Sequence, residues 1–244
     1  MVFEVDEFVF EPPYEVAFAR RVLLKPAAAY PLPHPVTTSR ETLAAVIRGI
    51  RKVSDADILL LEGSSEEESV LENYRSLGYD FPRILTLDVR DCFAVEVENP
   101  LPRPFALPTF WLPNVVLACD FLVSVAPFKI VAGMGHFNVM NMLGVLATAK
   151  YGGITSDARG LWQRFGLQNL VADLYFTLPF DIGIVDGRSK FSSSGDLTQG
   201  DSTEYGKIFV ADPYDADLEA SQEAGVDTPY LRLIKEAKAS QEAQ

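Results

Sequence analysis

The chain has few of the side chains from which soft-metal centres are built. It contains two cysteines, Cys92 and Cys119, and two histidines among 244 residues. Neither cysteine belongs to a C-x-x-C pair, so this chain alone cannot supply a four-cysteine zinc or iron–sulfur site. We expect both to be free thiols, with Cys119 packed as a small hydrophobe. A bound metal should then be a hard, exchangeable ion such as Mg²⁺ on oxygen ligands. The sequence does not indicate any particular cofactor.

Positive charge is also scarce. The chain has 21 basic and 34 acidic residues, a net charge of −13. Nucleic-acid binding depends on neutralising phosphates, so we expect no nucleic-acid partner, and no anionic membrane surface for the same reason. The acidic start, residues 1–15, is unlike a signal peptide, and no apolar run reaches the length of a membrane span. These features predict a cytoplasmic protein. The acidic composition does not exclude small anionic ligands, because a few lysines can make a local positive pocket.

Familiar catalytic motifs are missing. The sequence has no G-x-G-x-x-G, no G-x-x-x-x-G-K-[ST], no G-x-S-x-G and no H-E-x-x-H. Dinucleotide, phosphate-loop, serine-hydrolase and zinc-protease functions therefore lack their usual residues. The pair Gly133 and Gly135 ahead of a predicted helix is too short a signal to indicate an anion site by itself.

The pattern of apolar runs predicts the fold. With 48% hydrophobic residues, the chain can bury one sizeable core, and its β-branched runs alternate with helical patterns. This is typical of an α/β protein, and we expect a single domain, residues 1–244, with a mostly parallel or mixed sheet flanked by helices. Ser39 is the expected N-cap of the first helix. The predicted strands are 2–10, 22–25, 58–62, 84–87, 116–125, 182–185 and 208–211, and the predicted helices are 37–53, 66–77, 139–148, 161–175 and 230–238.

Three segments do not fit that alternation. Residues 99–113 carry five prolines, which predicts an extended edge or surface connection. Residues 187–206 are rich in Gly, Ser and Asp, which predicts a flexible loop, with a substrate lid as the alternative. Residues 239–244 are expected to form a polar tail.

Charged residues follow several predicted strands. Lys25, Glu62, Lys129 and Asp186 each come after an apolar run, and the carboxyl ends of parallel strands meet at one edge of a sheet. A lysine can hold an anionic group, while a carboxylate can accept a proton or bind a metal. We therefore predict ligand-binding roles for Lys25, Glu62 and Asp186. Asp212, which precedes a proline, is expected to be a helix N-cap instead.

The stretch after the strand FLVSVAP is the best candidate for chemistry. It brings Lys129, His136, Asn138 and Asn141 within thirteen residues. Imidazole titrates near neutrality and suits proton transfer, although a histidine at a helix start can also be a simple cap. We predict that His136 and Lys129 are catalytic. Asn138 and Asn141 are predicted to bind the ligand through their amides, with helix capping as the alternative.

Two further polar residues are expected to be structural. His34 lies in the proline-locked segment PLPHPV, which predicts surface exposure. Asp173 lies in the apolar helix LVADLYF, where a buried carboxylate needs a partner such as Lys or Arg.

Blocks of sequence from about Val22 to Ile234 resemble the uncharacterised domain-of-unknown-function family 362. The blocks are VLLKPAAAYPLPHPVTTSRETLAAVI, ILLLEGS, FLVSVAPFK, NMLGVL, GLQNLVADLYFTLPFDIGIVDG and GKIFVADPYDAD. The chain departs from the family pattern at Ala27, at Ile130 with Val131, and at Met140. The resemblance implies an α/β fold and a cluster of Lys25, Lys129 and Asn141, and it implies no reaction. Some relatives carry ferredoxin-type cysteine motifs, which this chain lacks.

Two functions from different classes follow. The first is an enzyme-like protein that binds a small anionic or carbonyl-bearing ligand at the strand carboxyl ends. The alternative is a non-catalytic accessory or docking protein for an iron–sulfur or redox enzyme. Clustering of the named residues in one concave pocket would favour the first. The sequence also leaves open whether the chain binds a protein partner or a second copy of itself.

Overall fold

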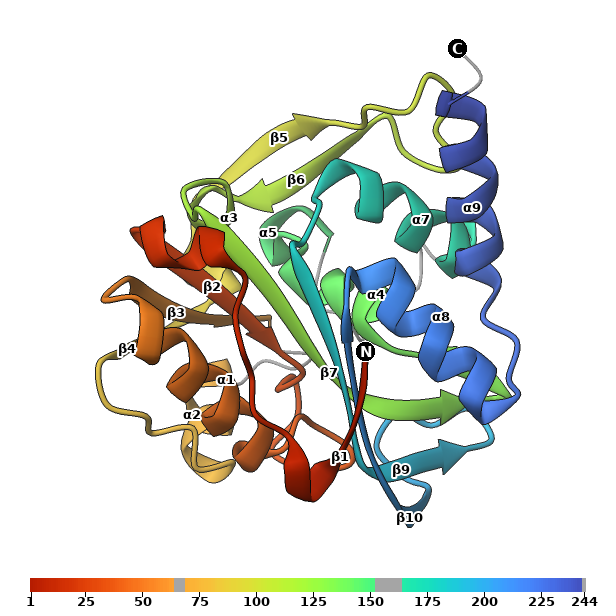
Figure 1. The fold of residues 1–244 in the computed structure, drawn as a ribbon. Coiled ribbons are helices and arrows are strands. Elements are labelled where there is room, and N and C mark those ends of the chain that lie inside the picture. Colours follow the sequence, from red (N-terminus) through yellow and green to blue (C-terminus); the bar gives the residue numbers. More distant parts are fainter. Residues whose placement is uncertain (64–68, 152–163, 243–244) are drawn as a thin grey trace.

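The fold is a mixed, mostly parallel sheet with helices on both faces (Figure 1). The computed structural model describes residues 1–63, 69–151 and 164–242. Within them, eight strands form one sheet in the order β1-β10-β9-β7-β2-β3-β4, with β8 paired to β7. The strands from β9 to β4 in this order are all parallel, whereas β10 and β8 are antiparallel to their neighbours. The predicted α/β class and single compact domain are thus confirmed. The strands are β1 (Val2–Glu4), β2 (Arg21–Pro26), β3 (Asp57–Glu62), β4 (Ile84–Asp88), β7 (Phe121–Val131), β8 (Met134–His136), β9 (Ile182–Ser193) and β10 (Asp201–Ala211).

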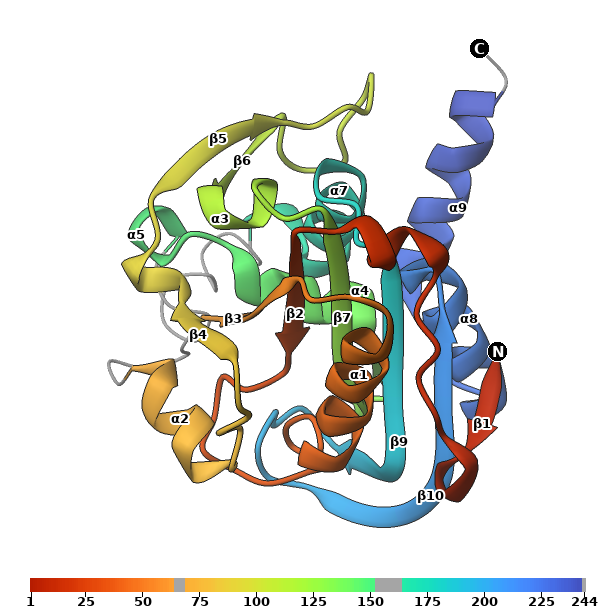
Figure 2. The same cartoon turned by 60° about the vertical axis from the view of Figure 1, so that its left-hand side comes forward.

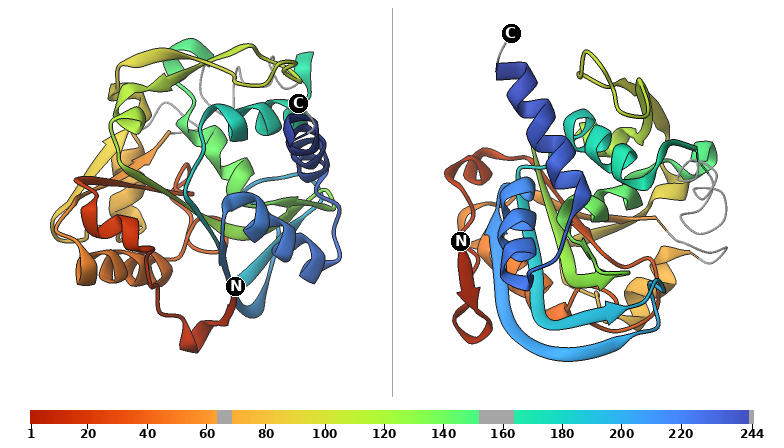
Figure 3. Two further views of the ribbon diagram at one scale, coloured as in Figure 1. Left: turned by 45° about the horizontal axis from the view of Figure 1, so that its top comes forward. Right: turned by 90° about the vertical axis from the view of Figure 1, so that its right-hand side faces the viewer.

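Helices cover both faces of this sheet (Figures 2 and 3). On one face lie α1 (Arg40–Val53) and α2 (Val70–Ser76); on the other lie α4 (Asn138–Asn141), α7 (Leu167–Thr177), α8 (Pro213–Ala224) and α9 (Pro229–Glu242). Side chains alternate across each strand, so neighbouring residues of β2 enter different cores: Leu24 packs with the α1 side and Leu23 with the α7 side. A strand buried on both faces reads as a continuous apolar run, which explains why β2 and β3 were predicted almost to the residue. The edge strand β4 is only partly buried, and its mainly apolar sequence ILTL was enough to predict it.

Two helix caps confirm their sequence signals. The Ser39 side chain accepts a hydrogen bond from the Thr42 backbone N–H at 3.1 Å, which fixes the start of α1. Asp212 accepts one from the Tyr214 N–H at 2.9 Å, with Pro213 as the first residue of α8.

The segment 187–206 is mostly strand, so the prediction of a loop was wrong for most of its length. Residues 187–193 continue β9 and residues 201–206 begin β10, and the two pair antiparallel with Lys190 opposite Thr203. Backbone hydrogen bonds between the strands and burial of Phe191 outweigh the Gly and Ser content. Residues 194–200, which connect the two strands, are the part without strand pairing.

Other boundaries also differ from the predictions. The strand predicted over 2–10 ends at Glu4 and is followed by a 3₁₀ turn at Val5–Glu7. Residues 114–117 form a short helix, α3 (Asn114–Leu117), so that β7 starts later than expected and runs to Val131. Helix α9 continues to Glu242, which makes most of the predicted polar tail helical. The helix predicted from 139 is broken into α4, a 3₁₀ turn at Met142–Val145 and α5 (Thr148–Tyr151). The first residues of the predicted helices 66–77 and 161–175 lie outside the described residues.

Residues 99–108 of the proline-rich segment join two strands of a separate small sheet, β5 (Ala94–Glu98) and β6 (Thr109–Pro113), and the last five residues of the segment form β6 itself. Asp173 of α7 holds this connection: its carboxylate accepts backbone N–H groups from Phe105, Ala106 and Leu107 at 2.7 to 2.9 Å. The expected Lys or Arg partner for Asp173 was therefore wrong. A loop with many prolines pairs few of its amides within itself, and a buried carboxylate can satisfy them.

His34 is not on the surface as predicted. Its side chain is 14% exposed, and Nε2 accepts a hydrogen bond from the Ser189 backbone N–H at 3.0 Å. The turn itself stays at the surface, with Pro31, Leu32 and Pro33 exposed, and only the His34 side chain is turned toward β9. Among the helices that the structure describes, none has the length and apolar character required to cross a bilayer.

Candidate functional site

A cavity of about 360 Å³ lies at the carboxyl ends of the parallel strands. Its walls come from β2, β3, β7 and β8, from the segments that follow β2, from α4 and its 3₁₀ extension, and from the 194–200 connection. Most lining side chains are apolar. Five predicted site residues are among the exceptions: Lys25, Glu62, Lys129, His136 and Asn141.

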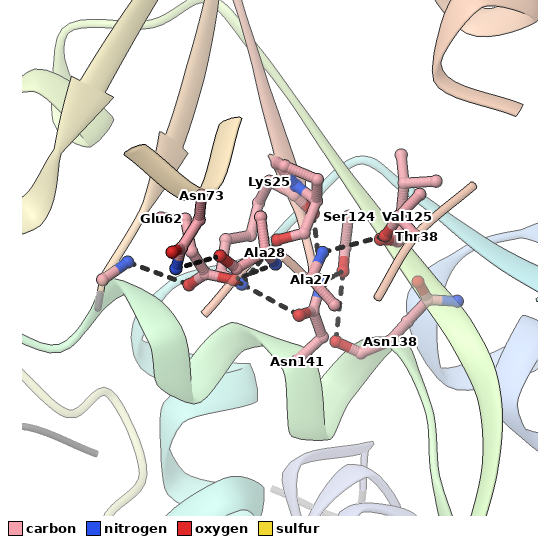
Figure 4. Close-up of polar contacts among 12 residues, drawn as sticks. Lys25, Ala27, Ala28, Thr38, Glu62, Asn73, Ser124, Val125, Asn138 and Asn141 are labelled. Atoms are coloured by element: carbon pink, nitrogen blue, oxygen red, sulfur yellow. Dashed lines mark hydrogen bonds and ion pairs between the residues drawn. The ribbon is translucent and has the colours of Figure 1, made fainter. Parts of the chain in front are cut away.

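Lys25 is a buried ammonium group with three acceptors. Its Nζ donates to Glu62 Oε2 at 2.8 Å, to Asn141 Oδ1 at 2.8 Å and to the Pro26 carbonyl oxygen at 2.9 Å (Figure 4). Burial lowers the pKa of Lys25, and the neighbouring Glu62 carboxylate opposes that effect. An ammonium has three protons to donate, so this set of partners satisfies it.

Glu62 is held as completely as Lys25. Its Oε2 also accepts the Ala28 backbone N–H at 2.9 Å, and Oε1 accepts the Gly63 N–H at 2.9 Å. Gly144 of the 3₁₀ turn approaches the pair so closely that a Cβ there would lie 2.1 Å from Glu62 Oε1 and 2.7 Å from Lys25 Nζ. A glycine is therefore required for the turn to close over the ion pair.

Asn141 ties the pair to the central strands. Its Nδ2 donates to the Lys25 backbone carbonyl oxygen at 3.0 Å and to Ser124 Oγ at 3.1 Å. Ser124, in turn, donates to the Asn138 carbonyl oxygen at 3.2 Å, as Figure 4 shows. Ser124 was not singled out by the sequence analysis, because a serine inside an apolar strand carries no motif. We call Lys25, Glu62, Asn141 and Ser124 the buried polar cluster.

Lys129 has a different environment. It is 8% exposed, and its Nζ donates to the Leu197 carbonyl oxygen at 3.1 Å and lies 5.2 Å from the centroid of the Phe191 ring. Within residues 1–63, 69–151 and 164–242, no carboxylate forms an ion pair with this ammonium group. Burial lowers the pKa of Lys129 to about 8.

His136 stands beside Lys129 in the cavity. The two residues are directly opposite in the antiparallel pairing of β7 with β8, so their side chains lie on the same face. Burial, and then the positive charge of Lys129, lower the pKa of His136 to about 4. The imidazole is therefore neutral near pH 7 and can both accept and donate a hydrogen bond. The sequence located His136 at a helix start, whereas it ends the short strand β8.

Two predicted ligand-binding residues do not line the cavity. Asp186 faces α1: its carboxylate accepts the Ser39 N–H at 2.9 Å and lies 3.7 Å from His34 Nδ1. The alternation of β9 accounts for this orientation, because Val185 packs toward α8 and the next residue must point to the other side.

Asn138 is also outside the cavity lining. Its side-chain Oδ1 accepts the Ile184 N–H at 3.2 Å, while its buried Nδ2 finds no hydrogen-bond acceptor in the described part of the chain. The capping group at this turn is instead Asp217 of α8, which accepts the N–H groups of Asn138 and Val139 at 2.8 and 2.9 Å and the Tyr230 hydroxyl at 2.8 Å. Burial raises the pKa of Asp217 to about 7. No local pattern marked this aspartate, because its partners come from distant segments.

The described part of the chain contains no cluster of three or more His, Cys, Asp or Glu side chains with the spacing to hold a metal ion. Cys92 and Cys119 are free and half-buried, and burial is the main factor that raises the pKa of each thiol. Counting only the residues that the structure describes, the cavity offers one satisfied ion pair, one ammonium group without a carboxylate partner and a neutral imidazole on a mainly apolar wall.

Comparisons with known proteins agree with the architecture. A family model described as Domain of unknown function (DUF362) matches residues 22–221. No curated protein matches the sequence. Among solved structures, the chain is similar to the lactate racemase apoprotein from Thermoanaerobacterium thermosaccharolyticum, with a TM-score of 0.52 and 14% identity. That match covers 90% of this chain and 53% of the racemase chain, so this chain spans about half the length of the racemase. At this identity the likeness shows the fold alone.

Proposed function

Since the chain belongs to the family described as Domain of unknown function (DUF362), we propose its function from the cavity, because that description names no reaction. The proposed function is that of an enzyme-like protein that binds a small anionic or carbonyl-bearing ligand. The observation that carries the proposal is Lys129, a buried ammonium group without a carboxylate partner among the described residues. A buried charge without a counter-charge lowers the stability of the fold, and a bound anionic ligand would supply that counter-charge.

The cavity has room for a small ligand, from a compound of a few heavy atoms up to a small metabolite. Its volume of about 360 Å³ is at the lower end of the range of small-molecule sites, and its walls are mainly apolar with a few convergent polar groups. A carboxylate or carbonyl oxygen of the ligand would lie on Lys129, and the neutral His136 imidazole would take or give a proton. The apolar wall would exclude water around the charged contact and strengthen it.

The buried polar cluster would form a fixed wall of the site. Because Lys25 donates to three protein acceptors, it would have to release one of them to hold an anion. We therefore assign anion binding to Lys129 and positioning to Lys25, Glu62 and Asn141. Asp186 and Asn138, which face other parts of the protein, have no part in ligand binding in this proposal.

The clustering of five predicted residues in one cavity supports this function over an accessory role for a redox enzyme. The likeness to lactate racemase adds no activity, although lactate, the compound in that protein's name, belongs to the class of small carboxylates proposed here.

Titration calorimetry of the protein against a panel of small carboxylates, 2-oxo acids and phosphates tests the proposal. Lys129→Met keeps the aliphatic stem and deletes the charge, and it should weaken binding by about 1.5–3 kcal/mol, or roughly tenfold to a hundredfold and somewhat beyond. Lys52→Met removes an exposed lysine of α1 and serves as the matched control. Equal affinities of the parent and Lys129→Met proteins for every ligand that binds would remove Lys129 from the site.

A further inference from the structure

The position of Lys129 suggests more than charge. Its amino group reaches a cavity with mainly apolar walls, beside a neutral imidazole, and its single hydrogen-bond acceptor among the described residues is a backbone carbonyl oxygen. Lysines that act as nucleophiles are found in this kind of desolvated setting. Lys25, by contrast, cannot be such a nucleophile, because its lone pair becomes available only if the Glu62 ion pair is broken.

We propose that Lys129 is a nucleophile that forms a Schiff base with the carbonyl carbon of a small aldehyde or 2-oxo acid bound in the cavity. This inference rests on the proposed function and makes it narrower: the ligand is a carbonyl compound, and it is bound covalently.

The reaction is balanced without a further reactant. The neutral amine of Lys129 attacks the carbonyl carbon, and the carbonyl oxygen takes up a proton as the C–N bond forms. The resulting carbinolamine loses its hydroxyl group with the remaining amine proton as water, and a C=N double bond is left between Nζ and the ligand. His136, on the same face and neutral at physiological pH, is placed to move a proton from nitrogen to oxygen.

The amine is available in the required form. With its pKa near 8, about a tenth of Lys129 is neutral at pH 7, whereas an ordinary lysine with a pKa of 10.5 is neutral in roughly one molecule in three thousand. Imine formation should therefore be faster at Lys129 than at exposed lysines, and binding of the substrate in the cavity should increase this difference in rate. The Leu197 carbonyl oxygen, 3.1 Å from Nζ, orients the amine.

Reductive trapping tests the inference. The full chain is incubated near pH 7 with pyruvate or glyoxylate and sodium cyanoborohydride, which reduces an imine to a stable secondary amine, and the modified residue is located by peptide mass spectrometry. We expect one adduct per chain, with at least about tenfold more label on the Lys129 peptide than on the peptide of exposed Lys52. Lys129→Arg, which keeps the charge but cannot form an imine, should lose that adduct, and Lys52→Met should keep it.

The outcomes separate the two proposals. Propionate has the carboxylate but no ketone, so it should bind in calorimetry and protect Lys129 from trapping without forming an adduct. Binding of carboxylates together with label spread evenly over the lysines, or no label at Lys129, would overturn the Schiff base and leave the anion site. Absence of binding to every ligand in the panel would overturn the proposed function itself. Mapping of the parent protein decides the question even if Lys129→Arg does not fold.

Discussion

Lys25 and Lys129 enter the same cavity from the neighbouring strands β2 and β7, and both are almost fully buried. Lys25 donates to a carboxylate, an amide and a backbone carbonyl group, whereas Lys129 donates to one backbone carbonyl group. For Lys25, the folded chain itself supplies the counter-charge. For Lys129, the described residues supply none, which leaves that role to a ligand.

The difference shows how burial alone can mislead. Burial lowers the pKa of both amino groups, so a perturbed pKa does not by itself distinguish a structural lysine from a functional one. The partners make the distinction. Removing one member of a satisfied pair leaves an unpaired buried charge, whereas removing an unpaired charge relieves the fold. The two lysines should therefore respond to the same substitution with opposite changes in stability.

The largest expected effect is the loss of stability in Lys25→Met. The substitution leaves the Glu62 carboxylate buried without its counter-charge, and the free energy of unfolding should fall by about 3–5 kcal/mol. Urea denaturation followed by circular dichroism measures the change. The double variant Lys25→Met, Glu62→Leu removes both charges and should be less destabilised than the single one. A loss below roughly 1 kcal/mol in Lys25→Met would show that the ion pair is not what holds this part of the fold.

Lys129→Met should have the opposite sign. It removes a buried charge with no carboxylate partner, so the free energy of unfolding at pH 7 should rise by about 1–3 kcal/mol. Because the folded-state pKa of Lys129 is below that of the unfolded chain, the parent protein gains stability as the pH rises from about 8 to about 10.5. The advantage of the variant should shrink over the same range. A destabilised Lys129→Met protein would mean that Lys129 has a structural partner.

Ligand affinity gives the next largest effect. An anion that lies on the Lys129 ammonium group should bind about tenfold more weakly at pH 9 than at pH 7, because the group loses its proton with a pKa near 8. Calorimetry at several pH values, with a carboxylate that does not titrate in this range, measures the change. The decline should be absent from Lys129→Met. A decline that begins only near pH 10 would assign anion binding to an ordinary, exposed lysine.

The smallest effect concerns His136. With a pKa near 4, its imidazole should keep the chemical shifts of the neutral form from pH 8 down to about pH 5.5. The chain has two histidines, so a His136→Gln variant assigns the signals in a proton NMR titration. The folded-state pKa lies below the unfolded value of 6.5, so His136 also makes the fold lose stability as the pH falls from about 6.5 to about 4. A midpoint near 6.5 for His136 would place it in solvent and outside the proposed proton transfer.

Prediction from sequence succeeded where a local pattern was sufficient. Strands β2 and β3 follow from continuous apolar runs, the edge strand β4 follows from a mainly apolar one, and Ser39 and Asp212 follow from capping patterns. The sequence analysis did not predict β8, the β5–β6 hairpin or the strand character of 187–206. Each of them is stabilised by backbone pairing with a neighbouring strand and not by an apolar run of its own.

For the candidate site, the order of residues along the chain was enough to find the charged groups at the ends of the predicted apolar runs. Lys25, Glu62, Lys129 and Asp186 were predicted to lie at one end of the sheet because parallel strands share a direction. The tertiary structure decided which of them face the cavity and which are already paired. Strand alternation turns Asp186 toward α1, and the approach of Gly144 and Asn141 closes the Lys25–Glu62 pair. Lys129 is left beside His136 because β8 folds back along β7, a contact that depends on the position of the backbone in three dimensions.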